Sequence, residues 1–330
     1  MGKNKTAATH YSDTPSPRPP ASFLHLFGPV RSRRLGLSLG VDMVPFKTCT
    51  LDCVYCECGA TTSLTVGRMP YVASADILDE LNRYMQANQR PDYITFGGSG
   101  EPTLNSDLGR TVRAVKRRHP SCKTALLTNG TLFTDPAVRA ECLVFDLALP
   151  SLDAVSPGVF AKVNRCHASL DNARIIDGLA AFVCEFTGPV WLEVFIVPGV
   201  NDTEEELRRF KDAITRIAPA RVQLNSLDRP PADPGVREAP PGLLDRIAAV
   251  LRPLPVEIIS RRAAPAAPAA PEPNAAAAVL AACRRRPLTV EDAAVTAGMN
   301  INEAAVLLET LVREKRLTTD AVGARVFYRA

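Results

Sequence analysis

The sequence lacks three features, each of which would have placed it in a broad class of proteins. No stretch approaches 18 consecutive apolar residues, and the polar, proline-containing start has no hydrophobic core of a secretion signal. The 39 basic and 35 acidic residues are mixed along the chain and leave a net charge of +4, which is no strong electrostatic footprint for nucleic acid or an anionic membrane. The nine cysteines follow no regular disulfide framework. We therefore expect a soluble, cytoplasmic protein with reduced thiols and no membrane partner.

The cysteines that are present are unevenly distributed. Four of them crowd into one short segment, Cys49, Cys53, Cys56 and Cys58. The other five are scattered through apolar runs and have no assigned chemistry: Cys122, Cys142, Cys166, Cys184 and Cys283. Clustered thiols in a chain with no signal peptide indicate a metal site.

Composition divides the 330 residues into four pieces. Residues 1–22 are rich in Ser, Thr and Pro and are predicted to be a disordered leader, because they offer too little apolar surface to offset chain entropy. Residues 23–260 are long enough for one large core domain. Residues 261–275 include an Ala/Pro run, which reads as a semi-rigid linker, and residues 276–330 form a small C-terminal module with its own apolar periodicity.

The core domain alternates short apolar runs with helical patterns. Strands are expected at 38–44, 93–96, 124–128, 144–149, 190–197, 221–227 and 256–259, and helices at 107–118, 172–182, 203–217 and 242–251 and after Ser74, a candidate helix cap. This alternation predicts an α/β fold with a parallel sheet and right-handed crossovers. About six such units suit a partial (βα)6 barrel of TIM-like architecture, in which the chemistry lies at the carboxyl ends of the strands.

The loop after the first expected strand carries Cys49-x₃-Cys53-x₂-Cys56. Three thiolates at this spacing can hold one face of a cubane iron–sulfur cluster and leave its fourth iron open to a small molecule. A structural zinc site is the main alternative, but it would normally use a second, separated ligand pair, and none is visible downstream. Cys58 would close the cluster as a fourth ligand, yet its single-residue spacing from Cys56 makes joint ligation awkward, so we take it as a non-ligand.

The loop after the second strand reads FGGSGEPTLN. Gly97, Gly98 and Gly100 allow a ligand to approach the backbone closely, and Glu101 adds a carboxylate suited to a cation. Glycine-rich loops also bind phosphates, but this one has no Lys-Ser/Thr after the glycines and its acidic residue would oppose an anion.

Polar residues also follow the later strands. The candidates are Thr128 and Asn129, then Ser151 and Asp153, and finally Arg165, whose guanidinium suits a carboxylate. Each of them has an ordinary alternative role, as a turn former or a surface side chain. Cys166 beside Arg165 is a candidate hydrogen donor or quencher, or an inert packing residue.

CTLDCVYC and GGSGEPTL, in this order, resemble the two signature segments of the radical S-adenosylmethionine (radical SAM) superfamily. The resemblance implies an enzyme whose [4Fe-4S] cluster is held by Cys49, Cys53 and Cys56. In that superfamily one electron from the cluster cleaves S-adenosylmethionine to methionine and a 5′-deoxyadenosyl radical, which abstracts hydrogen from the substrate. An external donor such as flavodoxin or ferredoxin would supply the electron.

The resemblance also implies roles for the residues that bind S-adenosylmethionine. Tyr55 would lean toward the adenine, and the backbone of Gly97, Gly98 and Gly100, with Glu101 near it, would contact the methionine ammonium. Thr128, Asn129, Ser151 and Asp153 would surround the ribose, and Arg165 would hold the methionine carboxylate.

A narrower resemblance covers roughly residues 26–230. RSRRLGLSLGVDMVPFKTCTLDCVYC, NRCHASLDNARIIDGL and FIVPGVNDTEEEL resemble an uncharacterised branch of radical enzymes related to the wyosine tRNA-modifying enzymes. The chain shows no flavodoxin-like domain and no second cluster loop, so a tRNA substrate does not follow. The substrate is left open, with RNA and a protein side chain as candidates.

The C-terminal module resembles a winged-helix domain. Its second expected helix, 302–314, carries three glutamates against few basic residues, which favours protein or substrate docking over DNA binding. Two classes of function follow: a radical SAM enzyme, or an iron–sulfur sensing regulator that acts through the winged helix. The glycine-rich segment favours the enzyme, because a sensor needs no S-adenosylmethionine site.

Overall fold

The computed structural model describes residues 23–32, 34–87, 90–259, 274–323 and 325–330. The predicted leader, 1–22, and nearly all of the predicted linker, 261–275, lie outside these residues. Ala275 itself begins a helix, so the C-terminal module starts one residue earlier than its composition indicated. In the described part of the chain, no helix is both long and apolar enough to cross a bilayer. The cytoplasmic location stays a prediction.

The core is a mixed α/β fold, as expected. Its strands are β1 (Leu26–Ser32), β2 (Gly36–Val41), β5 (Tyr93–Phe96), β6 (Lys123–Thr128), β7 (Leu147–Pro150), β8 (Trp191–Ile196), β9 (Arg221–Ser226) and β10 (Val256–Ile258). One sheet has the order β1-β2-β5-β6-β7 and a second the order β10-β9-β8. Parallel bridges from Ala148 to Val190 and from Ser151 to Glu193 join β7 to β8. From β2 to β10 the strands therefore follow one another in parallel, so that their carboxyl ends share one rim.

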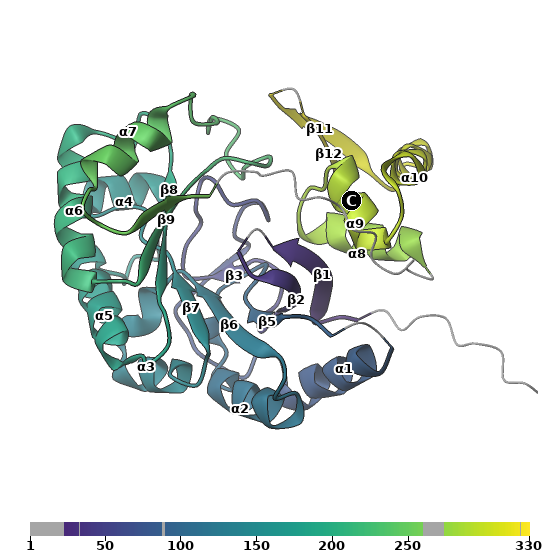
Figure 1. The fold of residues 1–330 in the computed structure, drawn as a ribbon, viewed down its shortest axis with the longest axis horizontal. Helices are drawn as coiled ribbons and strands as arrows, with labels where there is room; N and C mark the ends of the chain where they lie inside the picture. Colours follow the sequence, from purple (N-terminus) through teal and green to yellow (C-terminus); the bar gives the residue numbers. More distant parts are fainter. Residues whose placement is uncertain (1–22, 33, 88–89, 260–273, 324) are drawn as a thin grey trace, which may run out of the picture.

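Helices cover the outer side of this strand array (Figure 1). They are α1 (Ser74–Ala87), α2 (Leu108–Arg118), α3 (Pro136–Cys142), α4 (Pro157–Val163), α5 (Asn172–Glu185), α6 (Glu204–Ile217) and α7 (Leu243–Val250). The short 3-10 helices η1 (Pro102–Leu104) and η2 (Thr131–Thr134) follow β5 and β6. Leu39, Ile94 and Phe96 on the central strands are completely buried, as expected for a parallel sheet covered on both faces.

Three local expectations need correction. Strand β7 begins at Leu147 rather than at Val144, because the Asp146 carboxylate accepts hydrogen bonds from the Thr124 backbone and hydroxyl just before the strand. Ser74 is not a helix cap: it lies within α1, and its hydroxyl pairs with the Thr111 hydroxyl at 2.7 Å. The sequence does not predict strand β1, because Pro29 interrupts its pattern of apolar residues. The strand pairs antiparallel with β2, and the register shifts between Phe27 and Val30.

The C-terminal unit has a hydrophobic core of its own. It comprises α8 (Ala275–Arg285), α9 (Val290–Ala297), α10 (Ile301–Arg313) and the antiparallel pair β11 (Thr318–Val322) and β12 (Arg325–Arg329). Val279, Leu308 and Leu311 are almost completely buried within it. Thr289 caps α9 by accepting a hydrogen bond from the Asp292 backbone. Figure 1 shows this unit beside β1 and β2.

Asn201 ties the carboxyl end of β7 to that of β8. This fully buried amide donates to the carbonyls of Asp153 and Phe195, at 2.8 and 2.7 Å, and its oxygen accepts from the Val197 backbone at 2.8 Å. One side chain thus fixes the rim at the point where two loops begin.

We predict that Asn201→Ala lowers the free energy of unfolding by about 3 kcal/mol, because it leaves three buried backbone groups without partners. Asp202→Ala is the matched control. It removes one contact to the Gly199 backbone in the same loop and should cost less than about 1 kcal/mol. Denaturant titrations of both variants measure the difference, and equal losses would show that Asn201 has no special role.

Candidate functional site

The loop that carries the clustered cysteines is held along its length by backbone hydrogen bonds. Strand β3 (Thr48–Cys49) pairs with β4 (Ser63–Leu64) at the loop's two ends. Between them, the backbone amides of Asp52 and Val54 donate to the carbonyls of Asn164 and Val163, at 3.0 and 2.9 Å. The carboxyl end of α4, with Asn164 just after it, therefore fixes the middle of the cysteine loop.

Each of the three predicted cluster ligands has a different polar neighbour. The Asn129 amide lies 3.5 Å from the Cys49 sulfur, and the Asn164 amide lies 3.3 Å from the Cys53 sulfur. The Lys47 ammonium lies 3.0 Å from the Cys56 sulfur. All three thiols are half-buried.

The electrostatics distinguish these thiols. Burial, followed by the nearby Glu101 charge, raises the pKa of Cys49 to about 12. Burial and then Asp153 also raise the pKa of Cys53. A hydrogen bond from Cys58 and the charge of Lys47 lower the pKa of Cys56, although its burial opposes them. Cys56 also raises the pKa values of Cys49 and Cys53, and Cys49 raises that of Cys53.

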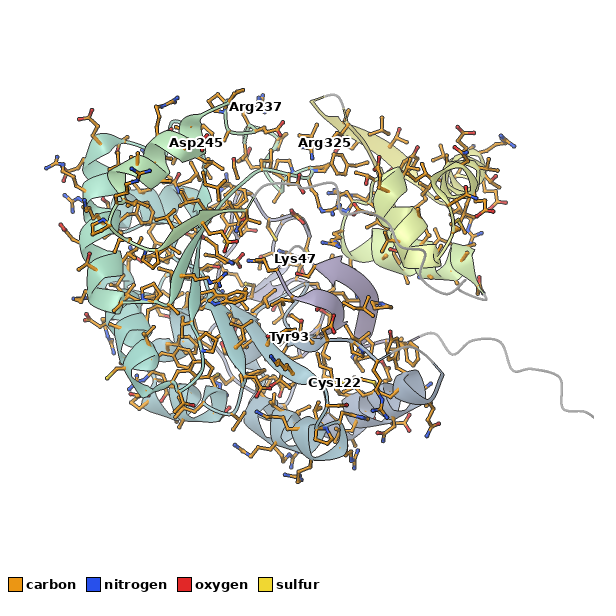
Figure 2. The ribbon with its side chains drawn as sticks, viewed as in Figure 1. Lys47, Tyr93, Cys122, Arg237, Asp245 and Arg325 are labelled. Carbon is orange, nitrogen blue, oxygen red and sulfur yellow. The ribbon has the colours of Figure 1, made fainter. Side chains whose placement is uncertain are left out.

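Lys47 is a site residue that sequence reasoning missed. Only 3% of it is exposed, and its backbone is in the left-handed region with φ of 57°. Burial lowers its pKa, but the charges of Cys56, Cys58 and Cys49 raise it above the ordinary value on balance. Figure 2 shows Lys47 toward the centre of the molecule. An ammonium enclosed among thiols favours a negatively charged occupant at this position.

The glycine-rich segment packs directly against the start of the cysteine loop. A side chain at Gly100 would place its Cβ 2.3 Å from the Thr48 carbonyl oxygen, so only glycine fits there. The Ser99 carbonyl accepts from the Lys47 backbone at 2.8 Å, and the Glu101 backbone donates to Thr48 at 3.1 Å. Gly97 adopts φ of 142°, a conformation open to glycine. The two predicted motifs are therefore adjacent.

Glu101 is buried and its carboxylate is fully engaged by hydrogen bonds. It accepts from the backbone and hydroxyl of Thr103, from the Thr128 hydroxyl at 2.6 Å and from the Asn129 backbone at 2.8 Å. Burial raises its pKa, and these hydrogen bonds partly offset the shift. Glu101, Thr128 and Asn129 thus form one unit that joins the glycine segment to the end of β6. The predicted contact of Glu101 with an ammonium group stays a prediction.

Tyr55 and Asp153 are also brought together. The Tyr55 hydroxyl donates to the Asp153 carboxylate, and the ring stacks on Phe195 with 3.8 Å between the ring centroids. Asp153 also accepts from the Phe195 backbone and from the Asn164 amide, both at 2.9 Å. Burial raises the pKa of Asp153 despite these hydrogen bonds. Asn164 donates hydrogen bonds to both Asp153 and Cys53. The sequence does not predict this role, because no motif distinguishes Asn164 from the polar residues around it.

Other predicted residues lie at the edges of this arrangement. Ser151 lines a small pocket together with Asn129, Asp153 and Asn164. Arg165 is half-exposed with φ of 44°, and its guanidinium pairs with the Asp233 carboxylate. The Asp233 backbone donates to Val54, so this ion pair still borders the cysteine loop.

The donor set fits an iron–sulfur cluster. Three thiols on one fixed loop are soft ligands of the kind that iron–sulfur clusters require. A buried ammonium beside them suits an anionic group. In the described residues no three His, Cys, Asp or Glu side chains gather closely enough to hold a single metal ion.

A family model described as the radical SAM superfamily matches residues 43–210, about half of the chain. The chain belongs to the radical SAM superfamily. Proteins of this superfamily bind a [4Fe-4S] cluster and S-adenosylmethionine, which are therefore its cofactors. Membership of this superfamily supports an enzyme and leaves its reaction open.

Related sequences extend over most of the chain. A UPF0026 protein of Helicobacter pylori strain J99 is 33% identical over 306 residues, which cover 92% of this chain and 96% of that protein. A UPF0026 protein of Methanocaldococcus jannaschii is 32% identical over 68% of this chain and 70% of its own length. A protein of Brachyspira hyodysenteriae named GTPase Obg is 38% identical over 62% of this chain, but the match spans only 30% of that longer protein.

Two solved structures share the fold of this chain. A radical SAM methyltransferase from Sphaerobacter thermophilus matches with a TM-score of 0.50 and 19% identity, over 68% of this chain and 66% of that one. SuiB of Streptococcus suis bound to the precursor peptide SuiA matches with a TM-score of 0.51 and 12% identity, over 67% of this chain and 48% of that one. At these identities the likeness concerns the fold alone.

We predict that Lys47→Met lowers the reduction potential of the cluster, on the order of tens of millivolts, because a nearby positive charge favours the more negative reduced state. Lys47→Arg keeps the charge and should restore most of the potential. A redox titration followed by electron paramagnetic resonance measures both, and an unchanged potential in Lys47→Met would contradict this role.

Proposed function

We propose that Cys49, Cys53 and Cys56 ligate the cluster and leave one iron open to S-adenosylmethionine. Three observations support the proposal: the three thiols lie on one loop whose ends pair as strands, the buried Lys47 ammonium is 3.0 Å from the Cys56 sulfur, and the glycine segment packs against the same loop. One-electron reduction of S-adenosylmethionine at such a cluster yields methionine and a 5′-deoxyadenosyl radical, an oxidant that abstracts hydrogen from the substrate. The substrate class is RNA or a protein side chain, and a flavodoxin or ferredoxin supplies the electron.

The chain's own residues bind and orient S-adenosylmethionine. The backbone of Gly97, Gly98 and Gly100 receives the methionine ammonium, and the buried charge of Glu101 lies behind it. Asn129, Ser151 and Asp153 line one pocket beside the thiols, which supports their place around the ribose together with Thr128. Tyr55, stacked on Phe195, forms a flat apolar surface on the adenine side. Arg165 would have to leave Asp233 to hold the methionine carboxylate.

Cys58 is a non-ligand in this proposal. Its thiol contacts the Cys56 thiol and the Gly98 carbonyl, with 3.8 Å between its sulfur and that oxygen. It therefore lies between the cysteine loop and the glycine segment. Cys166, which is half-buried against the core, is not needed for cluster binding.

The proposed architecture has four parts. The parallel array β2 to β10 with its outer helices is a partial (βα)6 barrel within residues 23–260. The C-terminal unit, three helices followed by an antiparallel pair of strands, is a winged-helix-like domain. The leader and the linker complete the chain. We retain the relation to wyosine tRNA-modifying enzymes as part of this proposal, and DNA binding by the C-terminal domain is not favoured.

An iron–sulfur sensing regulator is the second candidate. One observation favours it: Glu57, which lies between Cys56 and Cys58, contacts Arg229 at 3.3 Å, and Arg229 contacts Asp292 of the C-terminal unit at 2.6 Å. A sensor would need this connection but would not cleave S-adenosylmethionine.

The two candidates are separated by one assay. The protein is reconstituted anaerobically to four irons per chain, reduced with dithionite and incubated with S-adenosylmethionine. Chromatography should reveal 5′-deoxyadenosine if the chain is an enzyme. A fully loaded and reduced cluster that forms no cleavage product would favour the sensor.

Ligand identity is tested by paired cysteine variants. We predict that Cys53→Ala loses most of the cluster iron, because three protein ligands are the minimum for this site. Cys58→Ala should retain iron and the absorption of the cluster. Iron and sulfide analysis of both variants measures the cluster content. Equal losses of iron in the two variants would show that Cys58 is a ligand.

A further inference from the structure

Arg229 connects the cysteine loop to the C-terminal unit. It lies in the segment after β9, and only 6% of the residue is exposed. Its guanidinium contacts Glu57 of the cysteine loop at 3.3 Å. On the other side it donates to the Asp292 carboxylate of α9 at 2.6 Å and to the Pro287 carbonyl at 2.7 Å. One buried side chain thus spans from a position next to Cys56 to the C-terminal unit.

A second arginine connects the same unit to the glycine segment. Arg285, near the end of α8, donates to the Asp42 carboxylate at 3.0 Å and to the Leu24 carbonyl at 3.0 Å. Asp42 in turn accepts from the backbone and hydroxyl of Ser99, at 3.1 and 3.0 Å. A Cβ added at Gly98 would lie 2.5 Å from a carboxylate oxygen of Asp42, so Asp42 packs directly against the glycine segment.

In the first connection the Arg229 guanidinium faces two carboxylates, and Arg286 adds a second positive charge nearby. Burial lowers the pKa of Arg229, yet Asp292 and Glu57 raise it well above the ordinary value on balance. Burial raises the pKa of Asp292, but Arg229, the Thr289 backbone and Arg286 together lower it below its ordinary value. Removing one member of such a group leaves a buried charge without a partner, which is strongly destabilising. The connection therefore holds only while the C-terminal unit is docked.

We propose that the C-terminal unit positions both cofactor-binding loops, through Arg229 to the cysteine loop and through Arg285 and Asp42 to the glycine segment. Arg229, Arg285 and Asp292 are positioning residues, since none of them is placed against the cluster or S-adenosylmethionine. Anything that displaces this unit, including a substrate or protein partner that binds it, would loosen both loops together. The effect of this positioning on cofactor binding rests on the proposed function, whereas the positioning of the loops does not.

A third ion pair across the same interface supplies a matched control. Arg325 of β12 pairs with Asp228 at 2.6 Å and with Glu238 at 3.2 Å. It joins the C-terminal unit to the core as the other two arginines do, but neither partner belongs to a cofactor-binding loop. Arg325→Gln leaves Arg229 and Arg285 in place, so the C-terminal unit should stay docked and exchange at the two loops should stay near that of the wild type.

Hydrogen–deuterium exchange of the full-length protein tests the positioning without any need for catalysis. In Arg229→Gln and Asp292→Asn, amides of residues 47–59 should exchange about tenfold faster or more than in the wild type. Arg285→Gln should have this effect on residues 97–101. Amides of α5 serve as an internal reference for global unfolding. Asp292→Asn is the most informative variant, because Asp292 bonds Arg229 from outside the cysteine loop and asparagine retains an oxygen for the α9 cap.

Cofactor binding supplies the second readout. In Arg285→Gln, iron content should equal that of the wild type, while the dissociation constant for S-adenosylmethionine, measured from the change in the cluster's paramagnetic resonance spectrum, should rise about tenfold. Arg285→Lys should recover part of this loss.

If Arg229→Gln, Asp292→Asn and Arg285→Gln exchange no faster at these loops than Arg325→Gln, the proposal is overturned. If the wild-type protein binds no S-adenosylmethionine, the proposed function is overturned. Hydrogen–deuterium exchange alone then tests whether the C-terminal unit positions the two loops.

Discussion

The close contact between the cysteine loop and the glycine segment is the constraint on which the site depends. The Thr48 carbonyl lies where any side chain at residue 100 would have to be, and the Lys47 backbone donates to the Ser99 carbonyl. These contacts fix the distance between the thiols and the predicted S-adenosylmethionine loop. Because both segments follow parallel strands, neighbouring in the sheet, the fold brings them to the same rim. The thiols then lie beside the Lys47 ammonium, which requires a negative partner.

Much of this site could be predicted from residue type and order. Cys49, Cys53 and Cys56 are identifiable by spacing, and the glycines by their repeated occurrence after a strand. The unit of Glu101, Thr128 and Asn129 lies together because polar residues at the ends of neighbouring parallel strands meet. The α/β pattern likewise followed from the alternation of short apolar runs with helical periodicity.

Other features depend on contacts distant in sequence. Asn164 is one polar residue among several after α4, and only the fold places its amide between Cys53 and Asp153. Lys47 resembles an ordinary surface lysine until its burial is known. Arg229 and Asp292 are separated by 63 positions and lie in different units, so no local pattern could pair them. Strand β7 starts late because a carboxylate competes for the backbone of the neighbouring strand, which propensity does not reveal.

The central claim is a four-iron cluster with one iron that has no protein ligand. Mössbauer spectroscopy of the ⁵⁷Fe-reconstituted full-length protein, with and without S-adenosylmethionine, tests it most directly. The account predicts that one of the four irons changes its isomer shift on binding of S-adenosylmethionine, while the other three stay as they were. Four irons that are equivalent and unaffected by S-adenosylmethionine would contradict the account, because the cluster would then be closed by a fourth protein ligand.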